Sequence, residues 1–190
     1  MSSGEGEVLL ELRFHGRGGQ GAVKAAEVLV DAAILEGKYG QAFPFFGAER
    51  RGAPVEAYAR ISDKPIRIHS GIRTPDIVIV LDPSLLRLVN VLRGLKPGGK
   101  IIINSPKKVE IEGDYEVYVV NATKIALDLK LVVAGWAIVN TAMLGALVKA
   151  TNIVSLDSTL KAIRHTWAGD LGVRNAKAVE RAYHEVIKVK

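Results

Sequence analysis

Two segments of the chain carry residue types that bind anions. The first is the glycine-rich run Gly16-Arg17-Gly18-Gly19-Gln20-Gly21, and the second is the pair Arg50-Arg51 between Glu49 and Gly52. Glycines before a helix let backbone N–H groups approach a phosphate, and the helix dipole favours its negative charge. Adjacent guanidinium groups bind phosphate or carboxylate through paired hydrogen bonds. Both segments are therefore candidate binding loops.

The glycine-rich run lies between two clear periodic patterns. Before it, Leu10, Leu12 and Phe14 alternate with charged residues, which predicts a strand. After it, apolar residues recur at helical spacing over residues 22–35. The strand, turn and helix are the opening unit of an α/β layer fold.

Gly16, Gly18 and Gly21 also match the spacing of the dinucleotide-binding fingerprint. That fingerprint requires a second strand that ends in an acid about 20 residues further on, where the acid binds a ribose. Glu36 lies near this distance but still within the predicted helix, and residues 39–46 hold aromatics, glycine and proline. Three interpretations stay open: an NAD(P) site, a structural tight turn, or a loop that binds phosphate or faces another subunit.

The rest of the chain predicts more strands and helices of the same fold class. Residues 55–61 alternate and are followed by a turn and a return strand at 66–69, which predicts an antiparallel hairpin. Continuous apolar runs predict strands that are buried on both faces of a parallel sheet. These runs are residues 76–82, 101–103 and 117–120. Helices are expected over residues 85–92, 122–129, 141–150, 156–167 and 175–186.

We therefore predict a single domain over residues 1–190. Its fold class is α/β, a three-layer α/β/α sandwich with a mostly parallel (mixed) sheet and an inserted antiparallel hairpin. A chain of 190 residues with 48% apolar and 24% charged residues is long and apolar enough for one such core. Residues 131–148 carry no charge, but glycine, asparagine and threonine interrupt them, so we interpret them as a buried segment and expect no membrane span.

The composition also limits the chemistry of the chain. It has no cysteine, which excludes thiolate-bound iron–sulfur clusters and cysteine-ligated zinc on this chain and suits a cytoplasmic protein. Its four histidines show no metal-ligand spacing, so we expect no metal site. The net charge of +6 comes without a basic strip interleaved with aromatics, so we expect no nucleic-acid partner. No catalytic residue is expected on this chain.

Three further features accompany the candidate loops. Asp82 follows a predicted buried strand, where it is either a ligand or, as we favour, a cap for the helix behind Pro83. His15 is the only histidine beside the glycine-rich run. The aromatic residues Phe43, Phe45 and Phe46 are expected to lie under the domain or against a partner.

Four stretches together resemble the gamma chain of 2-oxoacid:ferredoxin oxidoreductases, most closely the pyruvate and 2-oxoisovalerate enzymes. They are residues 16–21, 46–54, 74–83 and 140–146, within a likeness that runs from about residue 8 to 186. The glycine motif followed at this distance by the arginine–glycine segment makes the resemblance specific. It implies oxidative decarboxylation of a 2-oxoacid to an acyl-CoA, with electrons passed to ferredoxin.

The resemblance also implies companion alpha, beta and delta subunits, so the chain would be a non-autonomous part of an oxidoreductase. Thiamine diphosphate with Mg is implied between the alpha and beta chains, and [4Fe-4S] clusters on the beta and delta chains. Coenzyme A is then a substrate, and no cofactor is assigned to this chain itself. The lack of cysteine agrees with this division.

On this resemblance, the two loops face a subunit junction near the path of CoA, where they bind its phosphates or hold the alpha chain in register. The candidate residues are Gly16, Arg17, Gly18, Gly19, Gln20, Gly21, Arg50 and Arg51. Three alternatives stay open. They are the small subunit of indolepyruvate:ferredoxin oxidoreductase, a free-standing NAD(P)-binding oxidoreductase, and a regulatory or scaffold module.

Overall fold

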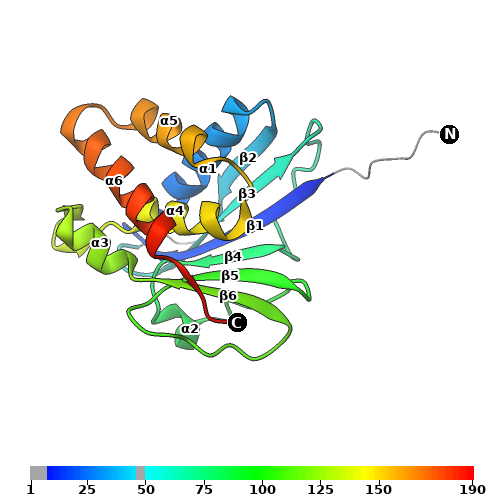
Figure 1. Cartoon of the computed structure of the whole chain (residues 1–190). Coiled ribbons are helices and arrows are strands. Elements are labelled where there is room, and N and C mark those ends of the chain that lie inside the picture. Colours follow the sequence, from blue (N-terminus) through cyan, green and yellow to red (C-terminus); the bar gives the residue numbers. More distant parts are fainter. Residues whose placement is uncertain (1–7, 46–49) are drawn as a thin grey trace.

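The computed structural model describes residues 8–45 and 50–190. A seven-stranded sheet in the order β2-β3-β1-β4-β5-β6-β9 runs through the described part, with most helices gathered on one of its faces (Figure 1). The sheet strands are β1 (Leu9–Arg17), β2 (Tyr39–Pro44), β3 (Pro54–Ser62), β4 (Ile77–Val80), β5 (Gly99–Asn104), β6 (Tyr115–Val120) and β9 (Ile187–Lys188). A separate two-stranded ribbon consists of β7 (Val132–Val133) and β8 (Trp136–Ala137). The helices are α1 (Ala22–Leu35), α2 (Leu85–Leu88), α3 (Ala122–Asp128), α4 (Asn140–Thr151), α5 (Leu156–Thr166) and α6 (Gly169–Glu185).

The sheet is mixed, as the sequence predicts. Strands β1, β4, β5 and β6 are parallel neighbours, and β9 adds an antiparallel edge. The predicted strand at residues 55–61 is present as β3, but the hairpin expected with residues 66–69 was wrong, because β3 pairs antiparallel with β2 and β1 instead. The carbonyls of Ile68 and Ser70 accept hydrogen bonds from the buried Arg60 guanidinium, which holds this segment off the strand edge.

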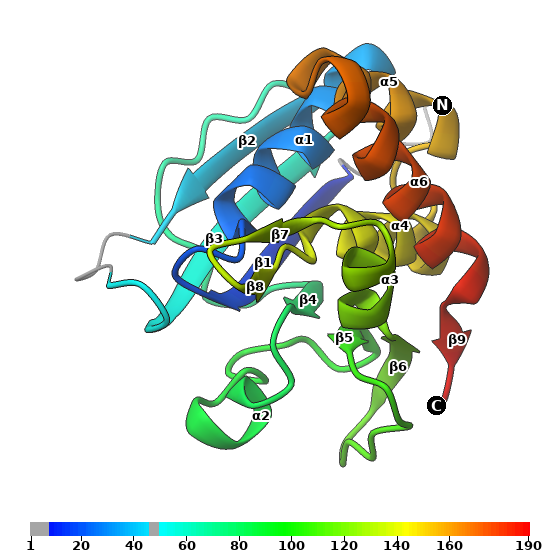
Figure 2. The ribbon, with the colours of Figure 1, turned by 90° about the vertical axis from the view of Figure 1, so that its left-hand side faces the viewer.

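Side chains on the two faces of the sheet enter two different cores. Phe14 and Ile79 face the larger core, which α1 and α4 cover together with α5 and α6 (Figures 1 and 2). Val78 and Ile101 face a smaller core under α2 and the irregular segments around it. The layer that covers this second face therefore consists of one short helix and irregular segments, and it is thin.

Helix α2 is shorter than the sequence predicts. It ends at Leu88, whereas the apolar spacing predicts a helix to residue 92. The carbonyls of Val91 and Arg93 bind the guanidinium of Arg13, which reaches up from β1. Because these carbonyls point at the sheet, the segment after Leu88 leaves the helical path.

The uncharged stretch at residues 131–148 divides into the β7–β8 ribbon and the buried helix α4. Helix α4 packs against α6 through Gly145, where any Cβ would collide with the Val179 carbonyl. Among the residues that the structure describes, no helix is long and apolar enough to cross a membrane.

Candidate functional site

The two candidate loops lie against each other through their backbones. The N–H of Gly18 donates to the Ala53 carbonyl at 2.9 Å, and the N–H of Gly52 donates to the Gly18 carbonyl at 3.0 Å. A Cβ on Gly18 would lie 2.5 Å from the Arg50 carbonyl oxygen. Only glycine fits here, so the glycine-rich run and the arginine loop form one structural unit.

Arg17 connects this unit to the segment after β4. Its Nε donates to the Asp82 carboxylate at 3.0 Å, and its two terminal nitrogens donate to the Gly52 carbonyl at 2.8 Å and the Ser84 hydroxyl at 2.7 Å. The guanidinium is therefore engaged by three groups of its own chain. Arg17 holds the loops in place, and its donors are directed inward.

Gln20 and Asp82 complete the same connection. The Gln20 side chain accepts from the Arg17 N–H at 2.7 Å and donates to Asp82 at 3.2 Å. The other Asp82 oxygen accepts from the N–H and the hydroxyl of Ser84 at 3.0 and 2.6 Å. Partial burial raises the pKa of Asp82, but the Ser84 hydrogen bonds and the Arg17 charge outweigh burial and hold the pKa below its ordinary value. Asp82 thus holds the turn ahead of α2 and also anchors the glycine loop.

The backbone between these anchors is open at Gly19. Gly19 has φ +95°, and a Cβ there would meet nothing within 4 Å. Gly21 is the N-cap of α1 at φ +85° and provides no side-chain cap for the helix amides. Gly16, by contrast, faces Ala22, where a Cβ would lie 3.3 Å from the Ala22 Cβ and tighten the contact between strand and helix. Gly19 is therefore the exposed residue of the loop backbone ahead of α1.

A pocket of about 370 Å³ opens beside this backbone, and we call it the arginine pocket. The two predicted loops provide Gly18, Gly19, Arg50 and Arg51 as one wall, and the β7–β8 ribbon provides Val133, Ala134 and Trp136 as the other. Both arginines are exposed, and neither forms an ion pair with a carboxylate in residues 8–45 or 50–190. Arg51 donates to the Ala134 carbonyl at 3.4 Å. The pocket therefore combines cationic groups, open backbone and an indole ring.

The ribbon wall is the part of this site that sequence reasoning missed. Residues 132–137 were interpreted only as part of an uncharged, buried stretch. In the sequence, the one signal for this ribbon was Gly135 between two short apolar pairs. In the structure, Ala134 and Gly135 have positive φ, +49° and +83°, as a two-residue hairpin turn requires.

The sheet order differs from that of a dinucleotide-binding fold. There, the strand after the first helix runs parallel to the first strand and carries the ribose-binding acid. Here that strand is β2, which keeps the direction of β1 but is separated from it by the antiparallel β3, so β2 is an edge strand and not a neighbour of β1. Glu36 lies at the far end of the 14-residue helix α1, about 20 Å from the loop. Its carboxylate accepts from Ser155 and Lys38 instead.

His15 lies in a buried charged cluster rather than in the arginine pocket. Its Nε2 accepts from the Nε of the fully buried Arg13 at 2.9 Å, and its Nδ1 lies 3.8 Å from Glu56. Burial, assisted by the charges of Arg13 and Arg93, lowers the pKa of His15 to about 4. His15 is therefore a neutral part of the framework beneath the loop.

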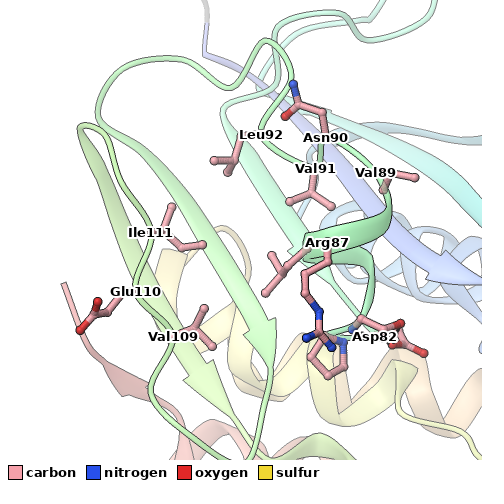
Figure 3. A pocket seen from close by; sticks show the side chains of 12 residues that line it. Asp82, Arg87, Val89, Asn90, Val91, Leu92, Val109, Glu110 and Ile111 are labelled. Carbon is pink, nitrogen blue, oxygen red and sulfur yellow. Dashed lines mark hydrogen bonds between the residues drawn. The ribbon is translucent and has the colours of Figure 1, made fainter.

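A larger pocket of about 560 Å³ lies on the thin face of the sheet, beyond Asp82 (Figure 3). The side chains of Val109 and Ile111 face Val91 and Leu92 across it. It is bordered by the segment that follows β4, which includes Asp82. Its walls are mainly aliphatic.

The predicted aromatic cluster is described in part. Phe43 is half-buried and its ring lies 5.3 Å from that of Tyr58, whereas Phe45 is 56% exposed. Phe46 and Glu49 lie outside the described residues.

Comparison with known proteins gives one consistent result. The family described as pyruvate ferredoxin/flavodoxin oxidoreductase matches residues 11–185. The chain is 53% identical to the pyruvate/ketoisovalerate oxidoreductases common subunit gamma of Thermococcus litoralis, over 94% of this chain and 98% of that one. It is 54% identical to the pyruvate synthase subunit PorC of Methanocaldococcus jannaschii, over 95% and 98% of the two chains. The crystal structure of the pyruvate oxidoreductase subunit PORC of Thermotoga maritima superposes with a TM-score of 0.82 at 36% identity, covering 96% of this chain and 99% of that one.

Proposed function

The chain belongs to the pyruvate ferredoxin/flavodoxin oxidoreductase family, and we propose that it is the gamma subunit of a pyruvate and/or 2-oxoisovalerate:ferredoxin oxidoreductase. Identity above 50% over nearly the full length of the chain carries this proposal. The relatives described above bear the names of pyruvate and ketoisovalerate enzymes, which favours these substrates over indolepyruvate. The antiparallel β3 between β2 and β1 disfavours a free-standing NAD(P) enzyme.

As a gamma subunit, the chain forms one gamma-type domain over residues 1–190 and works with alpha, beta and delta subunits. The complex oxidatively decarboxylates a 2-oxoacid to its acyl-CoA and passes electrons to ferredoxin. The proposal places thiamine diphosphate, Mg and the iron–sulfur clusters on the partner chains. For the clusters, the lack of cysteine in this chain supports it. The proposal includes a cytoplasmic location.

The arginine pocket has the chemistry to bind the phosphates of CoA. Arg50 and Arg51 offer guanidinium donors without a described carboxylate partner, and the open backbone at Gly19 offers amide donors at the start of α1. The volume of about 370 Å³ lies at the low end for a ligand site and holds only part of a molecule as large as CoA. The rest of CoA then lies against a partner subunit.

Arg17 and Gln20 have a different role in this proposal. Their side chains bind Asp82, Ser84 and Gly52, so they position the loop and do not contact the ligand. The phosphate contacts therefore come from Arg50, Arg51 and the loop backbone.

The test is the Michaelis constant for CoA in the assembled complex that carries Arg50→Ala with Arg51→Ala. Loss of a charge-assisted hydrogen bond costs about 1.5 kcal/mol or more, so the CoA constant should rise roughly tenfold or more. The constant for the 2-oxoacid should stay unchanged. Arg67→Ala, which removes an exposed arginine from the segment after β3, is the matched control. An unchanged CoA constant in the double variant would remove CoA from the proposal and leave these loops an interface role.

A further inference from the structure

A second hollow lies between the β7–β8 ribbon and the start of α6, and we call it the ribbon pocket. Its volume is about 200 Å³. Its apolar walls are Leu131, Val132, Val133, Ile138, Trp167 and Leu171. The ribbon separates it from the arginine pocket, with which it shares only Val133.

The ribbon pocket has the size of a side-chain socket. Sites for small molecules and cofactors usually span about 300–1,000 Å³, so 200 Å³ is too small for such a ligand. One aliphatic or aromatic side chain from another protein fits this scale, as at the centre of many protein interfaces. At its mouth, Val132 is 41% and Leu171 42% exposed, so apolar surface surrounds the opening.

The β7–β8 ribbon combines short strands, an exposed apolar side chain and a strained turn. Its strands are two residues long, and such a ribbon has little stability of its own. Val133 at its tip is 63% exposed, and the next residue, Ala134, holds a left-handed conformation that asparagine or glycine adopts with less strain. Exposed apolar side chains on a strained turn are typical of a surface that another chain covers.

The charges around the ribbon indicate the kind of partner. Lys130 and Arg174 line the ribbon pocket. Arg174 faces Asp170 at 2.8 Å, but Lys130 has no carboxylate within ion-pair distance among the described residues. Lys130 therefore gives this pocket a positive charge that no carboxylate in the described part of the chain balances. A second copy of the chain would bring like charges together, whereas an acidic surface would be attracted.

We propose that the ribbon pocket receives an apolar side chain of another subunit of the complex, whose contact surface carries a carboxylate opposite Lys130. This inference rests on the proposed function, because it takes the partner to be a subunit of the same oxidoreductase. It is independent of the CoA assignment, because neither Val132, Leu171 nor Lys130 lines the arginine pocket.

The test compares tagged variants in the native host by the amount of each partner subunit that co-purifies. Val132→Glu and Leu171→Glu place a negative charge on the apolar mouth of the pocket, and each should reduce the recovered partner at least tenfold. Lys130→Glu should also reduce recovery, and Lys130→Gln should reduce it less. Ile34→Glu, which alters another exposed aliphatic residue at the far end of α1, is the matched control and should recover the wild-type amount.

A second measurement excludes loss by misfolding. The chain has two tryptophans, and Trp167 lines the ribbon pocket. With 5-fluorotryptophan in this chain alone, the ¹⁹F resonance of Trp167 should shift when the wild-type complex assembles. In folded Val132→Glu, the resonance should not move when the partner subunits are present.

The outcomes separate the two proposals. If the wild-type chain recovers partner subunits and Val132→Glu recovers equal amounts, the ribbon pocket is not an interface and the gamma-subunit function stands. Equal loss in Val132→Glu and Ile34→Glu would likewise overturn the pocket assignment. If the wild-type chain recovers no other subunit, the proposed function itself fails.

Discussion

The stability of this chain should fall as the pH drops below about 6.5, because His15 is buried as a neutral imidazole. Only 2% of the residue is exposed, and its Nε2 accepts the hydrogen bond from Arg13, so that nitrogen has no room for a proton. Burial and the charges of Arg13 and Arg93 lower the pKa to about 4, against the opposing charge of Glu56.

The size of this stability loss follows from the difference between the pKa of His15 in the unfolded chain and in the folded chain. Between pH 4 and 6.5, the unfolded chain binds a proton at His15 that the folded chain excludes, so the free energy of unfolding rises with pH in this window. The contribution is complete above the unfolded pKa of 6.5 and is lost as the pH falls toward the folded value of about 4. At 1.36 kcal/mol per pKa unit, the full loss is about 3 kcal/mol, of which about 2.5 kcal/mol is reached near pH 4.5.

The variant His15→Gln isolates this effect, because glutamine offers an acceptor to Arg13 but does not titrate. Urea unfolding of both chains, near about pH 7 and about pH 4.5, gives the loss of stability in each. Carboxylates common to both chains contribute equally, so the wild type should lose about 2.5 kcal/mol more than the variant. Equal losses would refute the reasoning and would mean that His15 is hydrated or already charged in the folded chain.

Two further substitutions test the framework of the arginine pocket by urea unfolding. Gly18→Ala places a Cβ 2.5 Å from the Arg50 carbonyl and should cost about 2 kcal/mol, whereas Gly19→Ala meets no atom and should cost only the left-handed strain, about 1 kcal/mol. Similar costs for the two would argue that the loops do not touch. Asp82→Asn removes the charge that binds Arg17 and should cost about 1–2 kcal/mol at neutral pH, with the difference from wild type shrinking in acid as the pKa of Asp82 is reached. A constant difference at all pH values would contradict a charged Asp82.

The sequence predicts those elements that depend on local periodicity. The first predicted helix begins where α1 begins, directly after Gly21, and its predicted end near residues 36–38 lies within three residues of Leu35, because a glycine stops the apolar spacing there. The buried parallel strands are equally clear, since their apolar runs face cores on both sides of the sheet.

Elements that depend on distant residues were harder to predict. Strand β2 contains Gly40 and Pro44 and looks irregular by itself, but as an edge strand paired with β3 it tolerates both. Helix α2 is short because Arg13, more than 70 residues earlier, binds the carbonyls after it. Local sequence patterns show neither the pairing of β2 with β3 nor the contact of Arg13 with the segment after α2.

In the candidate site, too, the features set by local residue types could be predicted, whereas those set by contacts between distant residues could not. Both loops could be found from their residue types, but the backbone contact that joins Gly18 to Arg50 is tertiary. For that reason Arg17 and Gln20 were grouped with the possible ligand contacts, although their side chains face Asp82. The ribbon wall with Trp136 was missed because two-residue strands carry almost no periodic signal.

The central claim is that this chain works as a gamma subunit, and the most direct measurement is purification of the tagged chain from its native host. We predict that a thiamine-binding chain and a cysteine-rich chain co-purify, and that the preparation reduces ferredoxin only when both a 2-oxoacid and CoA are present. A chain that purifies alone and binds NAD(P) would contradict the gamma-subunit function.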